Sequence, residues 1–515
     1  MAGASAMLDE PVLLEAMPGS VAEPAVEPHL VRSVASSASQ LFLRRAVITG
    51  LSALSTAIVA RKIGSNDFGQ FSSALATFFL VMSASDLGFS LVLGRELAVQ
   101  PGQQGPLTRA ALQVMSVWAG VLTALTVAMV AVIGLTSTRG IVLLWMTPAV
   151  ATAGLTGVRQ IFLVTYRTRK MAFVDTVSNL GATAVICAVA LAGLGVGWIA
   201  AATSLQFVAN SVWMARVGLR LIRRLEGRRG LLEGQRPSTQ HRRTILAQSL
   251  PLGIASLLSS AYFTIDMALL GFVVSGPQLG YYAAAVKFLS ILVTVPGLVV
   301  TAALPGLSVR VQDRDELASL VASIWHWLAT VGLPLCAGTA VFAGIAIRIF
   351  FGPGYASSVG LLQVLAASAA VALASNLFGT ILVAQRRSRW MLVQNALALA
   401  GNVTGNILLV PRYGVAAAAW LTLGTEVFVC VGAALAIRRT VSLLPAVRVS
   451  ASPLLAVSAM MAVGVALGRW PVAAVAGACL AYASVLSITG GWPPEMRDRA
   501  ACIHDLVRRS GRPGR

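Results

Sequence analysis

The chain has 515 residues, of which 57% are hydrophobic and 11% are charged, and its formal net charge is +20. Soluble domains carry about a quarter charged residues, so this chain has too few to cover a water-facing surface, and its apolar residues must also face lipid. The positive charge does not indicate nucleic-acid binding, because the arginines stand in short clusters between long apolar runs. The composition predicts an all-α polytopic membrane protein and excludes a soluble enzyme.

The N-terminal segment, residues 1–40, contains five carboxylates and four prolines. A cleaved signal peptide begins with positive charge and continues into an apolar stretch, and this segment has neither. We expect it to be a disordered cytoplasmic tail, with membrane insertion driven by the first helix.

Apolar segments of roughly the 20 residues that a bilayer requires then follow in chain order. Those of the first half are 41–60, 70–94, 108–135, 140–164, 171–193 and 197–219. Those of the second half are 246–273, 281–305, 319–347, 357–384, 391–410, 415–437, 447–468 and 471–490. Together they predict about 14 transmembrane helices.

The predicted organisation alternates helical bundles with basic segments. It comprises an N-terminal six-helix bundle over 41–219, a basic cytoplasmic linker over 220–245, a C-terminal six-helix bundle over 246–437, a terminal helix pair over 438–490 and a basic cytoplasmic tail over 491–515. With the N-terminus in the cytoplasm, 31 of the 39 lysines and arginines fall in cytoplasmic segments and 6 in outer ones. The positive-inside rule therefore predicts that both termini are cytoplasmic.

The two halves of the chain echo each other. Phe68-Gly69-Gln70-Phe71 follows the first helix, and Leu279-Gly280-Tyr281-Tyr282 stands at the corresponding place in the second half. Gly195-Val196 and Gly414-Val415 both introduce Ala-rich helices. Because both halves begin in the cytoplasm, they are predicted to be parallel repeats around a central cleft, an arrangement typical of transporters.

Short motifs spread over residues 40–490 resemble those of one transporter family. The stretch Ala60–Phe71 (ARKIGSNDFGQF) resembles the "aRxLGpxxfGxy" signature of polysaccharide-export proteins, and Asp86-Leu87-Gly88 before Gly94-Arg95-Glu96 resembles their second-helix pattern. Leu250-Pro251-Leu252-Gly253, Gly280-Tyr281-Tyr282 and Tyr413-Gly414-Val415 fit the expected places in the second half. The chain thus resembles the Wzx-like oligosaccharide flippases of the multidrug/oligosaccharidyl-lipid/polysaccharide exporter superfamily.

The resemblance implies a transporter of the bacterial inner membrane rather than an enzyme. Its expected activity is to flip a polyprenyl-diphosphate-linked oligosaccharide from the cytoplasmic to the outer leaflet by alternating access, for cell-surface polysaccharide biosynthesis and lipopolysaccharide export. The expected partners are this lipid-linked substrate, membrane lipids, and a polysaccharide polymerase or glycosyltransferases. By resemblance alone, the terminal helix pair is expected to add a groove for the polyprenyl tail.

Charged side chains within the apolar segments identify candidate site residues, because a charge in mid-bilayer is costly unless it faces a cavity or a partner. The cations expected to attract the diphosphate are Arg95, Arg159 and Lys287. The carboxylates that are candidates for binding a coupling proton or sodium ion are Asp86, Asp266 and Glu426. Further polar lining of the cleft is expected from Asp175, Asn179, Asn402 and Asn406.

Structural roles compete with these assignments. Arg95, Arg159 and Asp175 are close enough to predicted helix ends to reach the membrane interface with their long side chains. Asp266 and Lys287 stand on adjacent predicted helices, where an ion pair is the alternative to two separate sites.

Other function classes fit the sequence less well. The sequence Asp313-Arg314-Asp315 mimics the metal-binding DxD of a glycosyltransferase, but an N-cap of the following helix explains it better. An ATP-driven pump needs a Gly-Lys pair in its phosphate-binding loop, and the chain contains none. No cofactor or metal is expected, and the five cysteines read as free packed thiols. A lipid II flippase, or else a multidrug-type exporter, is the alternative function.

Overall fold

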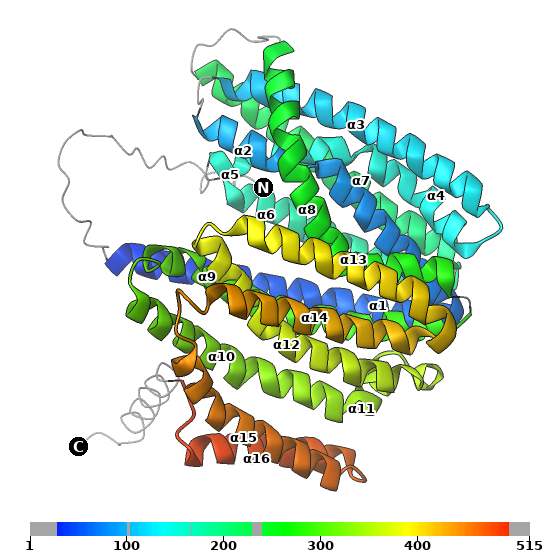
Figure 1. Cartoon of the computed structure of the whole chain (residues 1–515). Helices are drawn as coiled ribbons and strands as arrows, with labels where there is room; N and C mark the ends of the chain where they lie inside the picture. Colours follow the sequence, from blue (N-terminus) through cyan, green and yellow to red (C-terminus); the bar gives the residue numbers. More distant parts are fainter. Residues whose placement is uncertain (1–27, 100–102, 166, 229–238, 275, 494–515) are drawn as a thin grey trace, which may run out of the picture. The chain divides into compact units, whose positions relative to one another are not determined.

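The computed structural model describes residues 28–99, 103–165, 167–228, 239–274 and 276–493, and all regular elements in these ranges are helices (Figure 1). Residues Met1–Arg45 form a separate unit, so the packing described below concerns Ala46–Arg515. Most of the predicted N-terminal tail and nearly all of the predicted C-terminal tail lie outside the described residues.

The helices of the first half are α1 (Pro28–Asp86), α2 (Phe89–Val99), α3 (Gln104–Ile133), α4 (Thr138–Ala151), the 3-10 helix η2 (Ala153–Val158), α5 (Arg159–Val164), α6 (Thr168–Leu191) and α7 (Val196–Arg228). Those of the second half are α8 (Thr239–Val273), α9 (Gln278–Val309), α10 (Arg314–Val341), α11 (Ala343–Phe350), the 3-10 helix η3 (Pro353–Tyr355), α12 (Ser358–Ala384), α13 (Ser388–Tyr413), α14 (Val415–Ile437), α15 (Leu444–Ala466) and α16 (Pro471–Ile488). The predicted apolar segments fall on these helices in order, so the all-α class is confirmed.

Several helix boundaries differ from the sequence prediction. Helix α1 begins at Pro28, inside the segment predicted to be a disordered tail, and it joins two helices across a kink that lies in the first predicted loop. Its backbone leaves helical geometry at Gly64, where φ is 79° and ψ is 169°, a conformation that glycine adopts at little cost. Helices α7 and α8 both extend into the predicted linker at 220–245. These helices extend into segments that were predicted to be loops from their charge alone, because the residues there also favour helix.

The described residues contain 10 helices long and apolar enough to cross a membrane, or 12 if each of two bent pairs is one span. The bent pairs are Thr138–Ala151 with Ala153–Val164, at 41°, and the two parts of α8, at 60°. The longest candidate, Ile48–Val99, has 52 residues and contains the kink at Gly64. Helix α7 is not among the candidates, because Gln206, Asn210 and the arginines beyond them lower its hydropathy.

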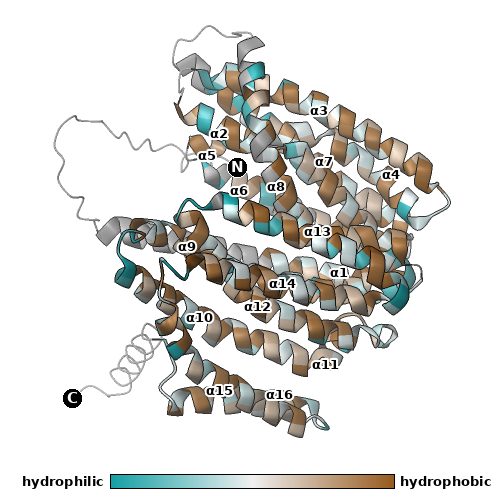
Figure 2. Cartoon of the chain, viewed as in Figure 1, coloured by the Kyte–Doolittle hydropathy of each residue, from teal (hydrophilic) through white to brown (hydrophobic). Residues whose placement is uncertain are grey.

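The outer surfaces of the helices are apolar, as those of a multi-pass membrane protein must be. Large side chains such as Val132, Trp420 and Leu480 are more than half exposed. Figure 2 shows hydrophobic residues along most helices and hydrophilic ones mainly near helix ends. Exposed surface of this kind is compatible with lipid and not with water.

The first helix of each half packs against the other half. Ala60 and Phe68 of α1 lie in a hydrophobic cluster with Tyr282 and other residues of the second half. Ile245 of α8 lies in a cluster with Leu93 and other residues of the first half. The two halves are therefore joined through α1 and α8, and not only through the basic linker.

Helices α15 and α16 pack against each other and reach the remaining helices through α10 (Figure 1). Three polar contacts hold them there. Trp325 Nε1 donates to Ser450 Oγ at 2.6 Å, Tyr482 donates to the Thr330 carbonyl at 2.6 Å, and His326 Nε2 lies 2.7 Å from the Gly491 carbonyl. His326 thus has a structural contact with the terminal helix pair.

The Asp313-Arg314-Asp315 sequence caps a helix. The Asp313 carboxylate accepts hydrogen bonds from the backbone amides of Asp315 at 2.9 Å and Glu316 at 3.0 Å, at the start of α10. These are two of the amides that a helix N-terminus leaves without intrahelical partners. The N-cap interpretation of the sequence is confirmed.

Candidate functional site

Several connections between helices lie together at one end of the molecule. The count of basic residues predicts that these connections are on the outer side of the membrane. Thr138 at the start of α4 donates to Asp67 near the kink of α1, at 3.4 Å. Tyr355, between α11 and α12, donates to the Ala60 carbonyl at 2.9 Å, and its ring meets that of Phe68 edge-on. We call this the outer end, after that prediction.

Backbones of the two halves touch at the outer end. A Cβ added to Gly69 would lie 2.5 Å from the amide nitrogen of Gly280, and a Cβ added to Gly280 would overlap the carbonyl of Ser65. Only glycine allows helices to approach this closely. The two motifs that echo each other in sequence, around Gly69 and Gly280, are therefore in direct contact.

Two arginines of the first half bind the C-terminal ends of second-half helices. Arg61 of α1 donates to the last carbonyls of α11, with its Nε 3.0 Å from the Phe350 oxygen. Arg139 of α4 donates to the Gly271 carbonyl near the end of α8 and lies over the Phe272 ring. Helix C-termini have free carbonyls and partial negative charge, which a guanidinium satisfies. These contacts join the two halves at the outer end.

The second half contains a cavity of about 270 Å³ between α8, α9, α12, α13 and α14. Apolar residues form part of its wall. Its polar residues are Tyr262, Asp266, Tyr282, Ser290, Thr294, Asn402, Thr422, Thr425 and Glu426. Two of the three predicted ion-coupling carboxylates thus line one cavity.

Hydrogen-bond donors converge on the carboxylate of Asp266. Thr422 donates to one carboxylate oxygen at 3.1 Å, and the Asn406 amide approaches the other at 3.5 Å. The same Asn406 amide donates to Asn402 Oδ1 at 2.7 Å. Asn406 is fully buried, and its own Oδ1 has no hydrogen-bond partner among the described residues. The Asp266 carboxylate therefore accepts hydrogen bonds from a neutral hydroxyl and a neutral amide.

Glu426 forms a second polar group in the same cavity. Its side chain is 8% exposed. Tyr262 donates to one oxygen at 2.9 Å and Ser375 donates to the other at 3.0 Å. Both oxygens accept from neutral hydroxyls, so its negative charge has hydrogen-bond donors but no cation in these contacts.

The first half contains a polar network on α5, α6 and α7. Arg159 donates to the Asp175 carboxylate at 2.7 Å and to Asn210 Oδ1 at 2.8 Å. Asn210 donates to the same carboxylate at 3.2 Å. One turn away, Gln206 donates to Asn179 Oδ1 at 3.1 Å. Arg159 is therefore neutralised by Asp175 within this network.

The other predicted site residues lie elsewhere. Arg95 is 58% exposed and donates to Glu96 and, at 2.5 Å, to Gln248. Asp86 accepts from the hydroxyl of Ser90 and so stabilises the start of α2. The three predicted cations have different hydrogen-bond partners, which are Glu96 and Gln248 for Arg95, Asp175 and Asn210 for Arg159, and Ser52 for Lys287.

Lys287 joins the two halves. Its ammonium group donates to the Ser52 hydroxyl of α1 at 3.1 Å. Asp266, the partner considered from sequence, is instead bonded by Thr422 and Asn406, and no ion pair links it to Lys287 among the described residues. The ion-pair alternative is wrong, because the two side chains leave their helices toward different neighbours.

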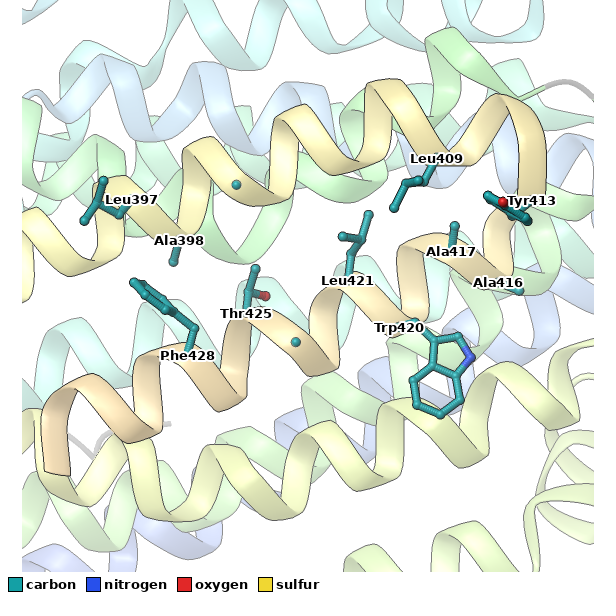
Figure 3. Close-up of a pocket in the computed structure, with 12 residues that line it drawn as sticks. Leu397, Ala398, Leu409, Tyr413, Ala416, Ala417, Trp420, Leu421, Thr425 and Phe428 are labelled. Carbon is teal, nitrogen blue, oxygen red and sulfur yellow. The ribbon is translucent and has the colours of Figure 1, made fainter. Parts of the chain in front are cut away.

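An apolar groove of about 910 Å³ runs between α13 and α14. Figure 3 shows Ala398 and Leu409 of α13 opposite Leu421 and Thr425 of α14. Thr425 lines both this groove and the polar cavity. The groove and the cavity therefore lie on two sides of the same helix pair.

The sequence analysis did not identify three residues of these networks, namely Ser375, Gln206 and Asn210. Gln206 and Asn210 are four residues apart within an apolar run, which places them on one face of α7. That spacing is the signal by which they were recognisable. Ser375 carries no comparable signal, because serine is common in membrane helices.

Comparisons with known proteins agree with this fold. A family model described as "Polysaccharide biosynthesis protein" matches residues 34–311. No curated protein sequence matches the chain. Among solved structures, the chain is similar to "Lipid II flippase MurJ, inward closed conformation", with a TM-score of 0.67 and 14% identity over 87% of this chain and 98% of that one.

Multidrug transporters share the fold as well. An inward-facing multidrug resistance MATE family transporter of the MOP superfamily gives a TM-score of 0.59, with 14% identity over 76% of this chain and 94% of that one. A eukaryotic MATE transporter gives 0.53, with 15% identity over 79% and 99%. At these identities the likeness shows the fold alone, which this chain shares with MurJ and the MATE transporters.

Proposed function

Because this chain belongs to the polysaccharide biosynthesis protein family, we propose that it flips a polyprenyl-diphosphate-linked oligosaccharide from the cytoplasmic to the outer leaflet. The observation that carries the proposal is the family match over residues 34–311, more than half of the chain. The MOP-superfamily fold supports it, since it provides two helical bundles that can rock against each other.

The proposal includes fourteen membrane crossings with both termini in the cytoplasm. Dividing Ile48–Val99 at the Gly64 kink gives two crossings in place of one, about 26 Å up to the kink and about 33 Å from there to the end of α1 at Asp86, against the ~30 Å core of a bilayer. Each bent pair is one further crossing, and α7 is another despite its polar residues. The arginine count in the connecting segments favours this orientation.

In this account the structure is a state closed at its outer end. Arg61, Arg139 and the contact between Gly69 and Gly280 hold the halves together there. Opening toward the outer leaflet breaks these contacts while α1 and α8, which pack across the halves, act as the connecting helices. The bend of 60° in α8 and the kink at Gly64 are the points where this motion bends the backbone.

Charge distribution assigns different roles to the two halves. The cavity around Asp266 and Glu426 carries carboxylates and no described lysine or arginine, so it suits a coupling cation rather than a diphosphate. Arg95 is largely exposed at the opposite end from Arg61 in the predicted topology, where it first meets the diphosphate. Arg159 and Lys287 then release their present partners, Asp175 and Ser52, and bind the diphosphate instead.

A lipid II flippase is the second candidate, because the likeness to MurJ covers 98% of that chain. Both candidate substrates join a polyprenyl diphosphate to a sugar head, so the same membrane chemistry serves either. The two differ only in the head group.

Reconstitution into vesicles tests the proposal. The purified protein is placed in vesicles that contain a fluorescent polyprenyl-diphosphate-linked oligosaccharide, or in parallel a fluorescent lipid II, and a membrane-impermeant quencher reports which leaflet holds the label. Faster movement of the oligosaccharide substrate supports the proposal, and movement of lipid II alone supports the second candidate. Folded protein that moves neither defeats both.

A further inference from the structure

We propose that the apolar groove between α13 and α14 holds the isoprenoid tail of the lipid-linked substrate during its passage. This inference rests on the proposed function, and it names the part of the protein that binds the lipid portion of the substrate. The expectation that the terminal pair α15 and α16 provides the tail groove is the alternative from which the experiment below distinguishes it.

The groove has the composition of a hydrocarbon site. Leucine, alanine and aromatic side chains form its walls, and Thr425 supplies the polar atom nearest the cavity behind it. Gly401 and Gly424 stand on opposite walls, and a Cβ added to either would meet no atom within 4 Å. The groove is open at these positions because both residues lack side chains.

Its length distinguishes an isoprenoid tail from an ordinary acyl chain. From Leu397 to Tyr413 the groove follows sixteen residues of α13, about 24 Å at the helical rise of ~1.5 Å per residue. One leaflet contributes about half of the ~30 Å hydrocarbon core, so an acyl chain anchored in one leaflet fills only part of the groove. A polyprenyl chain that passes from one leaflet to the other occupies all of it.

The ends of the groove also fit a substrate in transit. Tyr413 and Trp420 are 69% and 62% exposed near the outer end, where aromatic residues prefer the membrane interface. Phe428 lies toward the other end of α14 (Figure 3). Because Thr425 faces both spaces, a tail in the groove contacts the helices that carry Asn402 and Glu426 on their inner side. The tail and the candidate ion site thus share a helix pair.

Photolabelling tests the tail site without requiring transport. The probe is a polyprenyl diphosphate with a diazirine in its isoprenoid chain, added to the purified protein in lipid nanodiscs and irradiated, and the labelled peptides are located by mass spectrometry. We expect label on residues 397–428, removed by excess unlabelled polyprenyl diphosphate and not by excess phosphatidylglycerol. Equal competition by phosphatidylglycerol, or label confined to α15 and α16, would overturn the proposal.

Glycine substitutions sharpen the test. Gly401→Leu and Gly424→Leu each place a side chain in the open groove, and leucine also favours helix over glycine, so the fold is expected to persist. Labelling should fall about tenfold. Gly120→Leu, at an equally open and exposed glycine on α3, is the matched control and should label as the unmodified protein does. Unchanged labelling in both groove variants would also overturn the proposal.

The proposal of a tail site and the proposed function can be disproved independently of each other. A protein that flips the oligosaccharide substrate but does not label in the groove keeps the function and loses the tail site. A protein that labels in the groove but moves no substrate keeps the site and loses the function.

Discussion

The guanidinium of Arg61 donates a hydrogen bond to the Phe350 carbonyl, 289 residues away in the chain, at 3.0 Å. This contact joins the kinked first helix to the C-terminus of α11. The last carbonyls of α11 have no intrahelical partners, and Arg61 donates hydrogen bonds to them. A residue of one half therefore caps a helix of the other half at the outer end.

Replacing this arginine should open the outer end. In Arg61→Gln the charge is lost and the capping of α11 weakens, and since the site is exposed the expected effect is about 1 kcal/mol, or about a fivefold shift of population toward the open state. Spin labels at Asn66→Cys and Gly354→Cys, both exposed positions, should report longer distances. In Arg348→Gln, which keeps the backbone carbonyls, the distances should not change. Equal distances in all three proteins would contradict this role.

The contact between Gly69 and Gly280 gives a second prediction. Gly280→Val introduces a side chain where the Ser65 carbonyl lies, so the closed outer end becomes strained by about 1–3 kcal/mol. We expect the same spin-label pair to report an open outer end and transport to fall about tenfold. Gly360→Val, at a glycine with no atom within 4 Å of an added Cβ, is the control. Normal closure of Gly280→Val would show that the backbones need not touch.

A cycle of single and double variants separates the structural role of the Arg159 and Asp175 pair from a role in transport. Arg159→Ala leaves Asp175 with the hydrogen bond from Asn210 but without its cation, and Asp175→Ala leaves Arg159 bonded to Asn210 but without its counter-charge, each at a cost of about 1–3 kcal/mol. The double variant should regain much of that stability, because no unpaired charge remains. Thermal unfolding in detergent measures this cycle.

Transport measured on the same three proteins completes that test. If Arg159 contacts the diphosphate, transport stays low in the double variant although stability recovers. Recovery of transport together with stability would make Arg159 a structural residue only.

Substitution of the carboxylates in the cavity of the second half should impair the coupling of transport to an ion gradient. Asp266→Asn and Glu426→Gln keep the shape of each side chain while removing its charge, and they replace one accepting oxygen by a donating NH2 group. If a cation binds there, Asp266→Asn should abolish stimulation by a sodium or proton gradient while slow transport without a gradient persists. Asp315→Asn, which removes an exposed carboxylate at the start of α10, should respond normally. Full gradient stimulation in both cavity variants would exclude these carboxylates from coupling.

The sequence predicted the helices well because twenty-residue apolar runs are a strong local signal. The family resemblance read from the motifs around Gly69 and Gly280 is confirmed by the family match. Helix ends were predicted less well, since α1 starts at Pro28 and α8 starts at Thr239. Nothing local marks a helix that continues beyond the membrane.

The site was predicted only in part. Asp266, Asn402, Asn406 and Glu426 were selected because they are polar within apolar runs. Asp266, Asn402 and Glu426 line one cavity, and Asn406 is hydrogen-bonded to Asn402. The partners of Arg159 and Lys287 were not predictable, because they depend on how helices far apart in sequence are rotated against one another. Ser52, for example, meets Lys287 across 235 residues.

The central claim is that this chain moves a polyprenyl-diphosphate-linked oligosaccharide across the membrane. The most direct measurement is the rate at which a fluorescent substrate of that class changes leaflet in vesicles containing the purified protein, compared with vesicles containing Gly280→Val. The account predicts rapid movement with the unmodified protein and about tenfold slower movement with the variant. Movement no faster than in protein-free vesicles, with the protein folded, would contradict it.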